Sequence, residues 1–135
     1  MRSFIVTNVL VYADEGGDRR KQSLAADLIE MQLRAGTGVV STQVLQEFVN
    51  VALRKLMLPV PLIRTRLALY RRFEIVPASF YLITAALDVH VLHSVSFWDS
   101  LIVQAARQSG CVQLFTEDMN SGAVLAGVRL VNPFA

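Results

Sequence analysis

The chain is poor in cysteine and has no long run of apolar residues. Its single cysteine, Cys111, excludes an internal disulfide bond and any metal site built from several thiolates. The longest apolar runs, such as VLVYA, fall far short of the roughly 18 residues that a membrane-spanning helix needs. The opening segment MRSFIVTN lacks the apolar stretch of about 7–15 residues found in secretory signals. We therefore expect a cytoplasmic protein that makes no use of a membrane.

Length and composition indicate one folded domain over residues 1–135. A chain of 135 residues can bury one hydrophobic core but is too short for two domains of ordinary size. Apolar residues make up 53% of it, which argues against intrinsic disorder. The formal net charge is only +2, a surplus that an ordinary solvated surface explains. Basic clusters at 19–21 and 64–72 fit an RNA backbone or an acidic partner but are too short to establish either.

Short β-like segments alternate with helical ones along the whole chain. Five runs are typical of strands: Ser3–Val6, Gly38–Ser41, Glu74–Pro77, Val112–Thr116 and Val128–Val131. Apolar residues at helical spacing predict five helices, over Ser23–Arg34, Thr42–Leu56, Pro61–Phe73, Ser79–Val89 and Phe97–Ser109. This alternation predicts an α/β three-layer sandwich, a mostly parallel five-stranded sheet flanked by helices.

Three acidic residues lie among apolar neighbours. Glu47 occurs within STQVLQEFVNVAL, Asp99 within SVSFWDSLIV, and Asp118 soon after VQLFT. A desolvated carboxylate without a partner is strongly unfavourable, so such placements require an explanation. Each has a purely structural one: Ser96 and Asp99 fit an S-x-x-D capping box, Asp118 fits a turn cap, and Glu47 fits a half-exposed helix position.

The predicted topology brings the same three carboxylates to one edge of the sheet. Asp118 follows the fourth strand, Glu47 follows the second, and Asp99 begins the helix that leads into the fourth. Ligands of open parallel sheets bind at this edge. Clustered carboxylates raise one another's pKa unless a cation lies among them. With oxygen ligands alone, the expected ion is Mg²⁺ or Mn²⁺, which in metal nucleases polarises a phosphodiester oxygen and activates water.

Four segments closely resemble the motifs of PIN-domain ribonucleases, both in their order and in their spacing along the chain. They are TNVLVYA, QVLQEF, SFWDSLIVQAA and LFTEDMNSG. The nearest branch is the VapC-type toxins of bacterial toxin–antitoxin pairs, and the resemblance extends to the closing VRLVNPF. It implies four acidic residues that bind Mg²⁺ or Mn²⁺, cleavage of structured RNA such as tRNA, a homodimer, and inhibition by an antitoxin. Matched position by position, Glu47, Asp99 and Asp118 take three of the four acidic positions, as catalytic residues and metal ligands.

The resemblance also assigns supporting roles. Thr7 and Asn8 match the polar pair beside the first acidic position. Thr116 matches a hydroxyl that helps to hold the metal, a water molecule or Asp118. Glu117 is adjacent to the site, and we expect it to be an accessory residue at most.

The fourth acidic position of the pattern is occupied by Val6. By strand propensity alone Val6 is ordinary, since it follows Phe4 and Ile5. By the pattern it removes the central metal ligand, so this chain should bind metal poorly. We favour a parent gene that encodes aspartate here, because one base change converts an aspartate codon to a valine codon and inactive copies of a toxic nuclease survive cloning. A naturally degenerate homologue is the alternative.

Several other residues have structural explanations that we prefer to functional ones. His90 and His93 are three apart, but no partner completes a metal site, which favours core or surface histidines. Trp98 beside Asp99 resembles a platform for base stacking, although a single tryptophan at a helix start is more often part of the core. Ser96 and Ser100 have no histidine paired with them at a suitable position, so a serine nucleophile is not expected.

Two other functional classes compete with an RNA endonuclease toxin. A phosphoacceptor receiver domain also gathers acidic residues and Mg²⁺, but it needs a lysine near its last strand, and the only lysines are Lys21 and Lys55. A catalytically inactive PIN domain retained for partner or RNA binding is the second. The segment between Leu24 and Leu69, apolar with interspersed arginines, is our candidate groove for an amphipathic antitoxin helix with an acidic tail, although core burial would explain the same residues.

Overall fold

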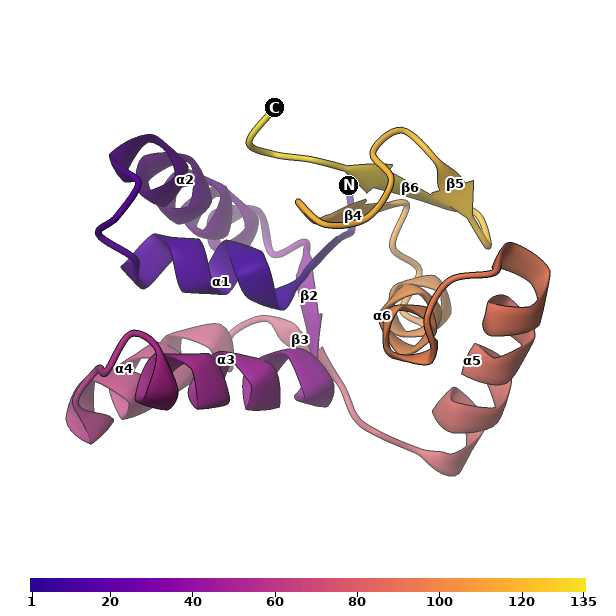
Figure 1. Cartoon of the computed structure of the whole chain (residues 1–135), viewed down its shortest axis with the longest axis horizontal. Coiled ribbons are helices and arrows are strands. Elements are labelled where there is room, and N and C mark those ends of the chain that lie inside the picture. Colours follow the sequence, from indigo (N-terminus) through magenta and orange to yellow (C-terminus); the bar gives the residue numbers. More distant parts are fainter.

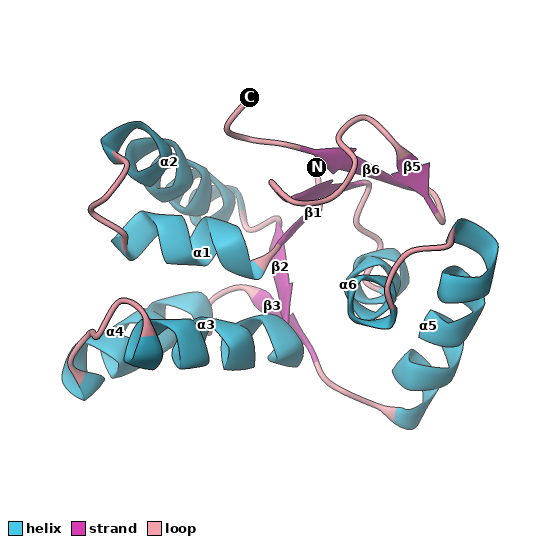
Figure 2. Cartoon of the chain, viewed as in Figure 1, coloured by secondary structure: helices cyan, strands magenta, loops and turns pink.

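The computed structural model describes residues 1–135 and is built around one six-stranded sheet (Figures 1 and 2). The strand order is β3-β2-β1-β4-β6-β5. Four of the five strand pairs are parallel, and only the edge pair of β5 and β6 is antiparallel. The strands are β1 (Ser3–Ile5), β2 (Gly38–Ser41), β3 (Glu74–Val76), β4 (Gln113–Phe115), β5 (Val124–Leu125) and β6 (Val128–Val131).

Six helices complete the outer layers. Helices α1 to α4 lie on one side of the sheet and α5 and α6 on the other (Figure 1). Their bounds are α1 (Thr7–Asp14), α2 (Arg19–Ala35), α3 (Thr42–Arg54), α4 (Val60–Tyr70), α5 (Phe80–His93) and α6 (Phe97–Gln108). The expected α/β three-layer sandwich with a mostly parallel sheet is therefore confirmed, and each of the five expected strands and helices is present.

The predicted number of strands was one too few. Strand β5 pairs with β6 through a two-residue turn in which Ala126 and Gly127 have φ values of 50° and 81°. Two successive positive φ values make a type I′ hairpin turn, the geometry that suits the twist of paired strands. Because β5 has only two residues and alanine occupies the first turn position in place of the usual asparagine or aspartate, the sequence gives little sign of this hairpin.

Helix α1 was also not predicted. Its sequence TNVLVYAD contains β-branched Val9 and Val11 and has no polar face at helical spacing. Both residues and the intervening Leu10 are buried, since α1 packs beneath α2 and against α3. Tertiary burial rather than local propensity fixes this helix. It starts directly after β1, which places its N-terminus at the carboxyl edge of the sheet.

The sheet centre and α6 form the core. Phe4, Ile5 and Leu114 on the central strands are fully buried, and so is Leu130 on β6. Seven residues of α6 are buried, from Ser100 to Ala106. No single helix is long and apolar enough to cross a membrane; only α5 and α6 taken together pass on length and composition, and they are bent by 111° at their junction.

Candidate active site

The seven predicted site residues line a single cavity of about 100 Å³ at the carboxyl edge of the sheet. The end of β1 leads through Val6 into α1, and the end of β4 leads into the loop that carries Asp118. Glu47 lies on α3 directly after β2, and Asp99 lies in the first turn of α6. The seven are Val6, Thr7, Asn8, Glu47, Asp99, Thr116 and Asp118. Residues separated by up to 112 positions in sequence thus meet in one place.

A short hydrogen-bond network fixes the loop after β4. The Asn8 side-chain amide donates to Asp118 Oδ2 at 3.0 Å. The Asp118 backbone N–H donates to the buried hydroxyl of Thr116 at 3.2 Å. The predicted support of Asp118 by Thr116 therefore exists as a backbone contact. The side-chain oxygen of Asn8, Oδ1, is buried and has no hydrogen-bond partner. Asp118 alone therefore sets the orientation of the Asn8 side-chain amide.

Asp99 and Glu47 form the second half of the acidic cavity. Ser96 caps α6 by accepting a hydrogen bond from the Asp99 N–H at 3.1 Å, one of the two contacts of the expected capping box. Burial raises the pKa of the Glu47 carboxyl, and the negative charge of Asp99 raises it further. The nearby Gln43 side chain lowers this pKa in part. Glu47 and Asp99 are therefore close enough to interact electrostatically.

Glu117 faces away from this cavity and makes a separate polar cluster. Its carboxylate accepts a hydrogen bond from the Tyr12 hydroxyl at 2.7 Å and pairs with Lys21 Nζ at 2.5 Å. These contacts, the one with Lys21 first, lower the pKa of Glu117. Lys21 also lies over the rings of Tyr12 and Phe134. Glu117 thus ties the loop that carries Asp118 to α1 and α2, which agrees with an accessory role.

Val6 interrupts the acidic cavity. It is 8% exposed and occupies the N-cap position of α1, where its side chain makes no capping hydrogen bond. Around it, no three His, Cys, Asp or Glu side chains lie close enough together to hold a metal ion. The donor set also lacks a carboxylate where the isopropyl group stands. As they are placed here, these residues do not fit a divalent ion, and the Val6 side chain offers neither an oxygen ligand nor a hydrogen bond that caps α1.

The cavity is also lined by two residues that the sequence did not predict as part of the site. Ile102 lies one turn after Asp99 on α6, so its position could have been inferred from the helical repeat. Met119 follows Asp118 in an irregular loop, for which no periodic signal exists. Both are apolar and close off the cavity beside the carboxylates.

The aromatic and histidine predictions have different outcomes. Trp98 is 66% exposed, so its assignment to the core is wrong. It lies on the N-terminal turn of α6, where the side chain projects from the surface beside Asp99. His90 is exposed and its Nδ1 contacts the Val95 carbonyl oxygen, which confirms a surface histidine.

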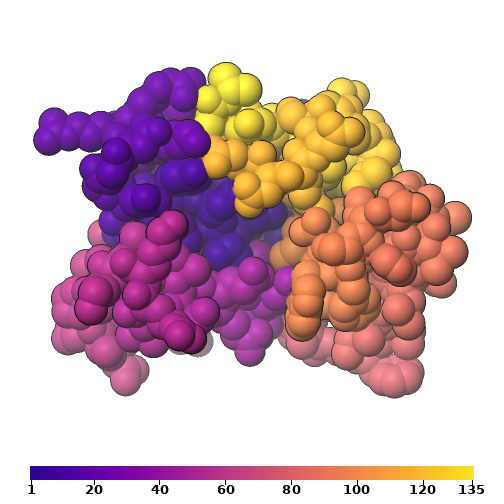
Figure 3. Space-filling view, in the orientation of Figure 1, coloured from indigo at the N-terminus to yellow at the C-terminus, as the bar shows by residue number.

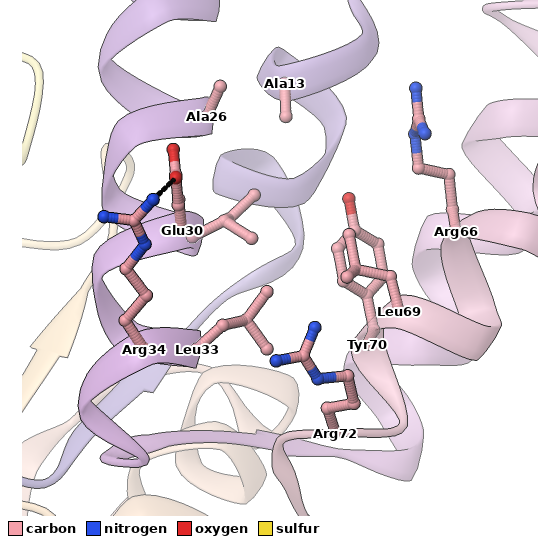
Figure 4. A pocket seen from close by; sticks show the side chains of 10 residues that line it. Ala13, Ala26, Glu30, Leu33, Arg34, Arg66, Leu69, Tyr70 and Arg72 are labelled. Carbon is pink, nitrogen blue, oxygen red and sulfur yellow. Dashed lines mark ion pairs between the residues drawn. The ribbon is translucent and has the colours of Figure 1, made fainter.

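A larger groove of about 390 Å³ lies between α2 and α4, away from the acidic cavity (Figure 4). Its apolar lining comes from α1, α2 and α4: Ala13, Ala26, Ile29, Leu33, Leu69 and Tyr70. Three arginines stand at its rim. Arg34 pairs with Glu30, Arg66 pairs with Asp14, and Arg72 makes no ion pair. The groove falls largely within the predicted Leu24 to Leu69 segment.

We expect Arg66→Met to lower the free energy of unfolding by about 2 kcal/mol, because it leaves a carboxylate that is only 6% exposed without its partner. Arg66 Nε contacts both Asp14 oxygens, at 2.9 and 3.0 Å, and so joins α4 to α1. Arg34→Met is the matched control, since the Arg34–Glu30 pair is exposed and should contribute under about 0.5 kcal/mol. Urea denaturation of both variants at one protein concentration measures the difference. Equal midpoints would contradict the expectation.

One comparison with known proteins identifies the family of this chain, and another establishes its fold. The model of the PIN domain matches residues 3–122. No curated protein matches the chain in sequence. Among solved structures, a toxin–antitoxin complex from Klebsiella pneumoniae is similar at 22% identity and a TM-score of 0.66, covering 97% of each chain. VapBC2 from Rickettsia felis, bound to a DNA fragment from its promoter, is similar at 19% identity and a TM-score of 0.69, covering 96% of this chain and 97% of that one.

A third similar structure is VapC20 from Mycobacterium tuberculosis, described as a toxin that cleaves the sarcin–ricin loop. It is 21% identical with a TM-score of 0.69, covering 94% of this chain and 98% of that one. At such identities the structures establish the fold, which is that of the three relatives. The PIN-domain model shows the family, because its match over residues 3–122 covers most of the chain. The matched range includes every residue that lines the acidic cavity. This chain belongs to the PIN-domain family.

Proposed function

We propose that this chain is the toxin of a type II toxin–antitoxin pair, a Mg²⁺- or Mn²⁺-dependent RNA endonuclease that Val6 has inactivated. The observation that supports the proposal most directly is the single cavity in which Glu47, Asp99 and Asp118 surround Val6. A fourth carboxylate at this position would give the oxygen-rich donor set that Mg²⁺ and Mn²⁺ prefer. Structured RNA such as tRNA is the proposed substrate.

Hydrogen bonds fix two of the three carboxylate-bearing segments around Val6. Asn8 and Thr116 hold Asp118 in place, and Ser96 fixes the start of the helix that carries Asp99. Glu47 contributes a carboxylate whose pKa is raised by burial and by Asp99. When bound, a divalent ion would supply Lewis-acid activation of the phosphodiester and of water. The chain with Val6 lacks the ligand set for it.

We also propose that the arginine-rimmed groove binds the antitoxin. Its floor is apolar and its rim carries Arg34, Arg66 and Arg72 (Figure 4). An amphipathic helix followed by an acidic segment complements both features. Arg72 has no acidic partner within the chain, so it is free to pair with a carboxylate of the antitoxin.

A homodimer is the proposed assembly, with α5 as its contact surface. Helix α5 lies at the edge of the molecule, in the salmon part of Figure 3. It buries Leu82, Ala86 and Val89 against the core, yet its outward side is also apolar. The exposed residues at helical spacing on that side are Phe80, Ile83, Leu87 and Val91. A second apolar face on one helix is typical of a surface that a partner covers.

The deciding experiment is RNA cleavage by the Val6→Asp variant beside the unaltered chain, both with Mg²⁺ or Mn²⁺. Activity in the aspartate form supports the inactivated toxin. If neither form cleaves RNA but both bind it, the chain is a PIN domain retained for binding. That second function is favoured by one observation, the well-packed isopropyl group of Val6 where a ligand would stand.

A further inference from the structure

A second cavity, of about 270 Å³, lies near the acidic one, because its lining residues Gln46, Trp98 and Leu101 directly precede Glu47, Asp99 and Ile102 of the acidic cavity. It is formed by the start of α3, the start of α5 and the first turns of α6. Its walls are mostly apolar and include Leu82, Phe97, Trp98 and Leu101. No charged side chain lines it. The volume lies just below the roughly 300–1,000 Å³ range of small-molecule pockets, so it suits a small flat group such as one nucleobase.

Trp98 supplies an open aromatic face at the mouth of this cavity. Its side chain is 66% exposed although tryptophan is among the most strongly apolar residues. The Phe97 ring meets it edge-on, with 5.9 Å between ring centroids and an interplanar angle of 64°. Trp98 directly precedes Asp99, which lines the acidic cavity. A base stacked on the Trp98 ring would therefore lie next to that cavity.

Two amide side chains add hydrogen-bonding capacity. Gln43 and Gln46 both line the cavity from the first turns of α3. Each amide can donate and accept, as the edges of nucleobases require. Gln46 directly precedes Glu47, which lines the acidic cavity, so the first turns of α3 form a wall between the two cavities. A strand that crosses this wall can place a base on one side and a phosphate on the other.

We propose that this cavity binds one nucleobase of the RNA strand, next to the phosphate that lies in the acidic cavity. The base stacks on Trp98, and Gln43 and Gln46 read its edge. The inference rests on the proposed function and adds to it the residues that set the base preference. Single-stranded bases are commonly held on aromatic side chains in this way, and stacking tolerates any base while the amides discriminate.

The chain offers a direct test because Trp98 is its only tryptophan. Intrinsic fluorescence is recorded while twelve-nucleotide strands of A, C or U are added to the unaltered protein in EDTA, which prevents cleavage. Binding is measured in parallel by the anisotropy of fluorescein-labelled strands. We expect RNA to quench Trp98, with an affinity that differs among the three strands.

Variants separate stacking from a structural role. Trp98→Leu should weaken RNA binding at least about fivefold, the lower end of what one stacked base contributes. Trp98→Phe should restore most of the affinity, and Gln46→Leu should reduce the difference among the three strands. Tyr81→Leu is the matched control, because Tyr81 is equally exposed at 65% but lies outside the cavity.

Three outcomes overturn the inference. RNA binding without any change in Trp98 fluorescence would place the strand elsewhere and leave the proposed function intact. A fluorescence change that follows protein concentration in the absence of RNA would mean that a second copy covers Trp98. Absence of RNA binding by both the unaltered chain and its Val6→Asp variant would remove the proposed function together with the inference.

Discussion

Val6→Asp is expected to turn an inactive chain into a Mg²⁺- or Mn²⁺-dependent ribonuclease. The substitution places a carboxylate in the cavity that already holds Glu47, Asp99 and Asp118. Loss of residues that merely support metal ligands costs about 10–100-fold in affinity or activity, so the gain of a direct ligand should reach at least that factor. The measurement is cleavage of a structured RNA, followed on a gel with and without the metal.

Two controls isolate the carboxylate. Val6→Asn adds a side chain with almost the same shape as aspartate. It can cap α1 but carries no charge, so this variant should stay inactive. Asp99→Asn in the Val6→Asp background should abolish the restored cleavage. Equal cleavage by the unaltered chain and by Val6→Asp would show that Val6 is no defect, and the proposed mechanism would be wrong.

Val6→Asp is expected to have two opposing effects on the free energy of unfolding. An acidic or amide residue at the N-cap of α1 would accept a hydrogen bond that Val6 leaves unmade, worth about 1 kcal/mol. A fourth carboxylate also adds repulsion among the acidic side chains of the cavity. Without metal, Val6→Asn should therefore be more stable than Val6→Asp. Added Mn²⁺ should raise the Tm of the aspartate form alone, because only that form gains a complete ligand set.

Much of the fold could be predicted because short strands and amphipathic helices alternate clearly in the sequence. Strand β2 and strand β6 have the predicted bounds, and the S-x-x-D pattern at Ser96 marked the start of α6 correctly. Helix α1 could not be predicted, because its apolar run VLVYA, with Val9 and Val11, has the same local pattern as a strand. Only its position beneath α2 makes it helical.

The grouping of the candidate site residues also followed from topology. Glu47 and Asp118 come after strands β2 and β4, and Asp99 begins the helix that leads into β4. Parallel strand pairing brings all three to the same edge of the sheet and into one cavity. The exposure of Trp98 could not be predicted, because a helix start is compatible with either face of the ring. The sequence predicts that Val6 replaces a metal ligand, and this stays a prediction. The position of Val6 as the uncapped N-terminus of α1 depends on where that helix begins, which the sequence does not show.

Leu87→Lys is expected to convert a dimer into a monomer. Leu87 is 50% exposed in the middle of the outward apolar stripe of α5, between Ile83 and Val91. Lysine is a good helix former, so the helix itself should persist. In a two-fold dimer the same patch meets itself, and each interface would therefore receive two ammonium groups. Unpaired charges at the centre of an apolar contact are strongly unfavourable.

Light scattering of the unaltered chain and of two variants at micromolar concentration measures this effect. Val112→Lys is the matched control, because Val112 is also 50% exposed but precedes β4, outside α5. The unaltered chain and Val112→Lys should have the mass of two chains, and Leu87→Lys the mass of one. A monomeric unaltered chain would refute the homodimer. A dimeric Leu87→Lys would refute α5 as its contact surface, because two lysines at the centre of that contact could not be accommodated without loss of the dimer.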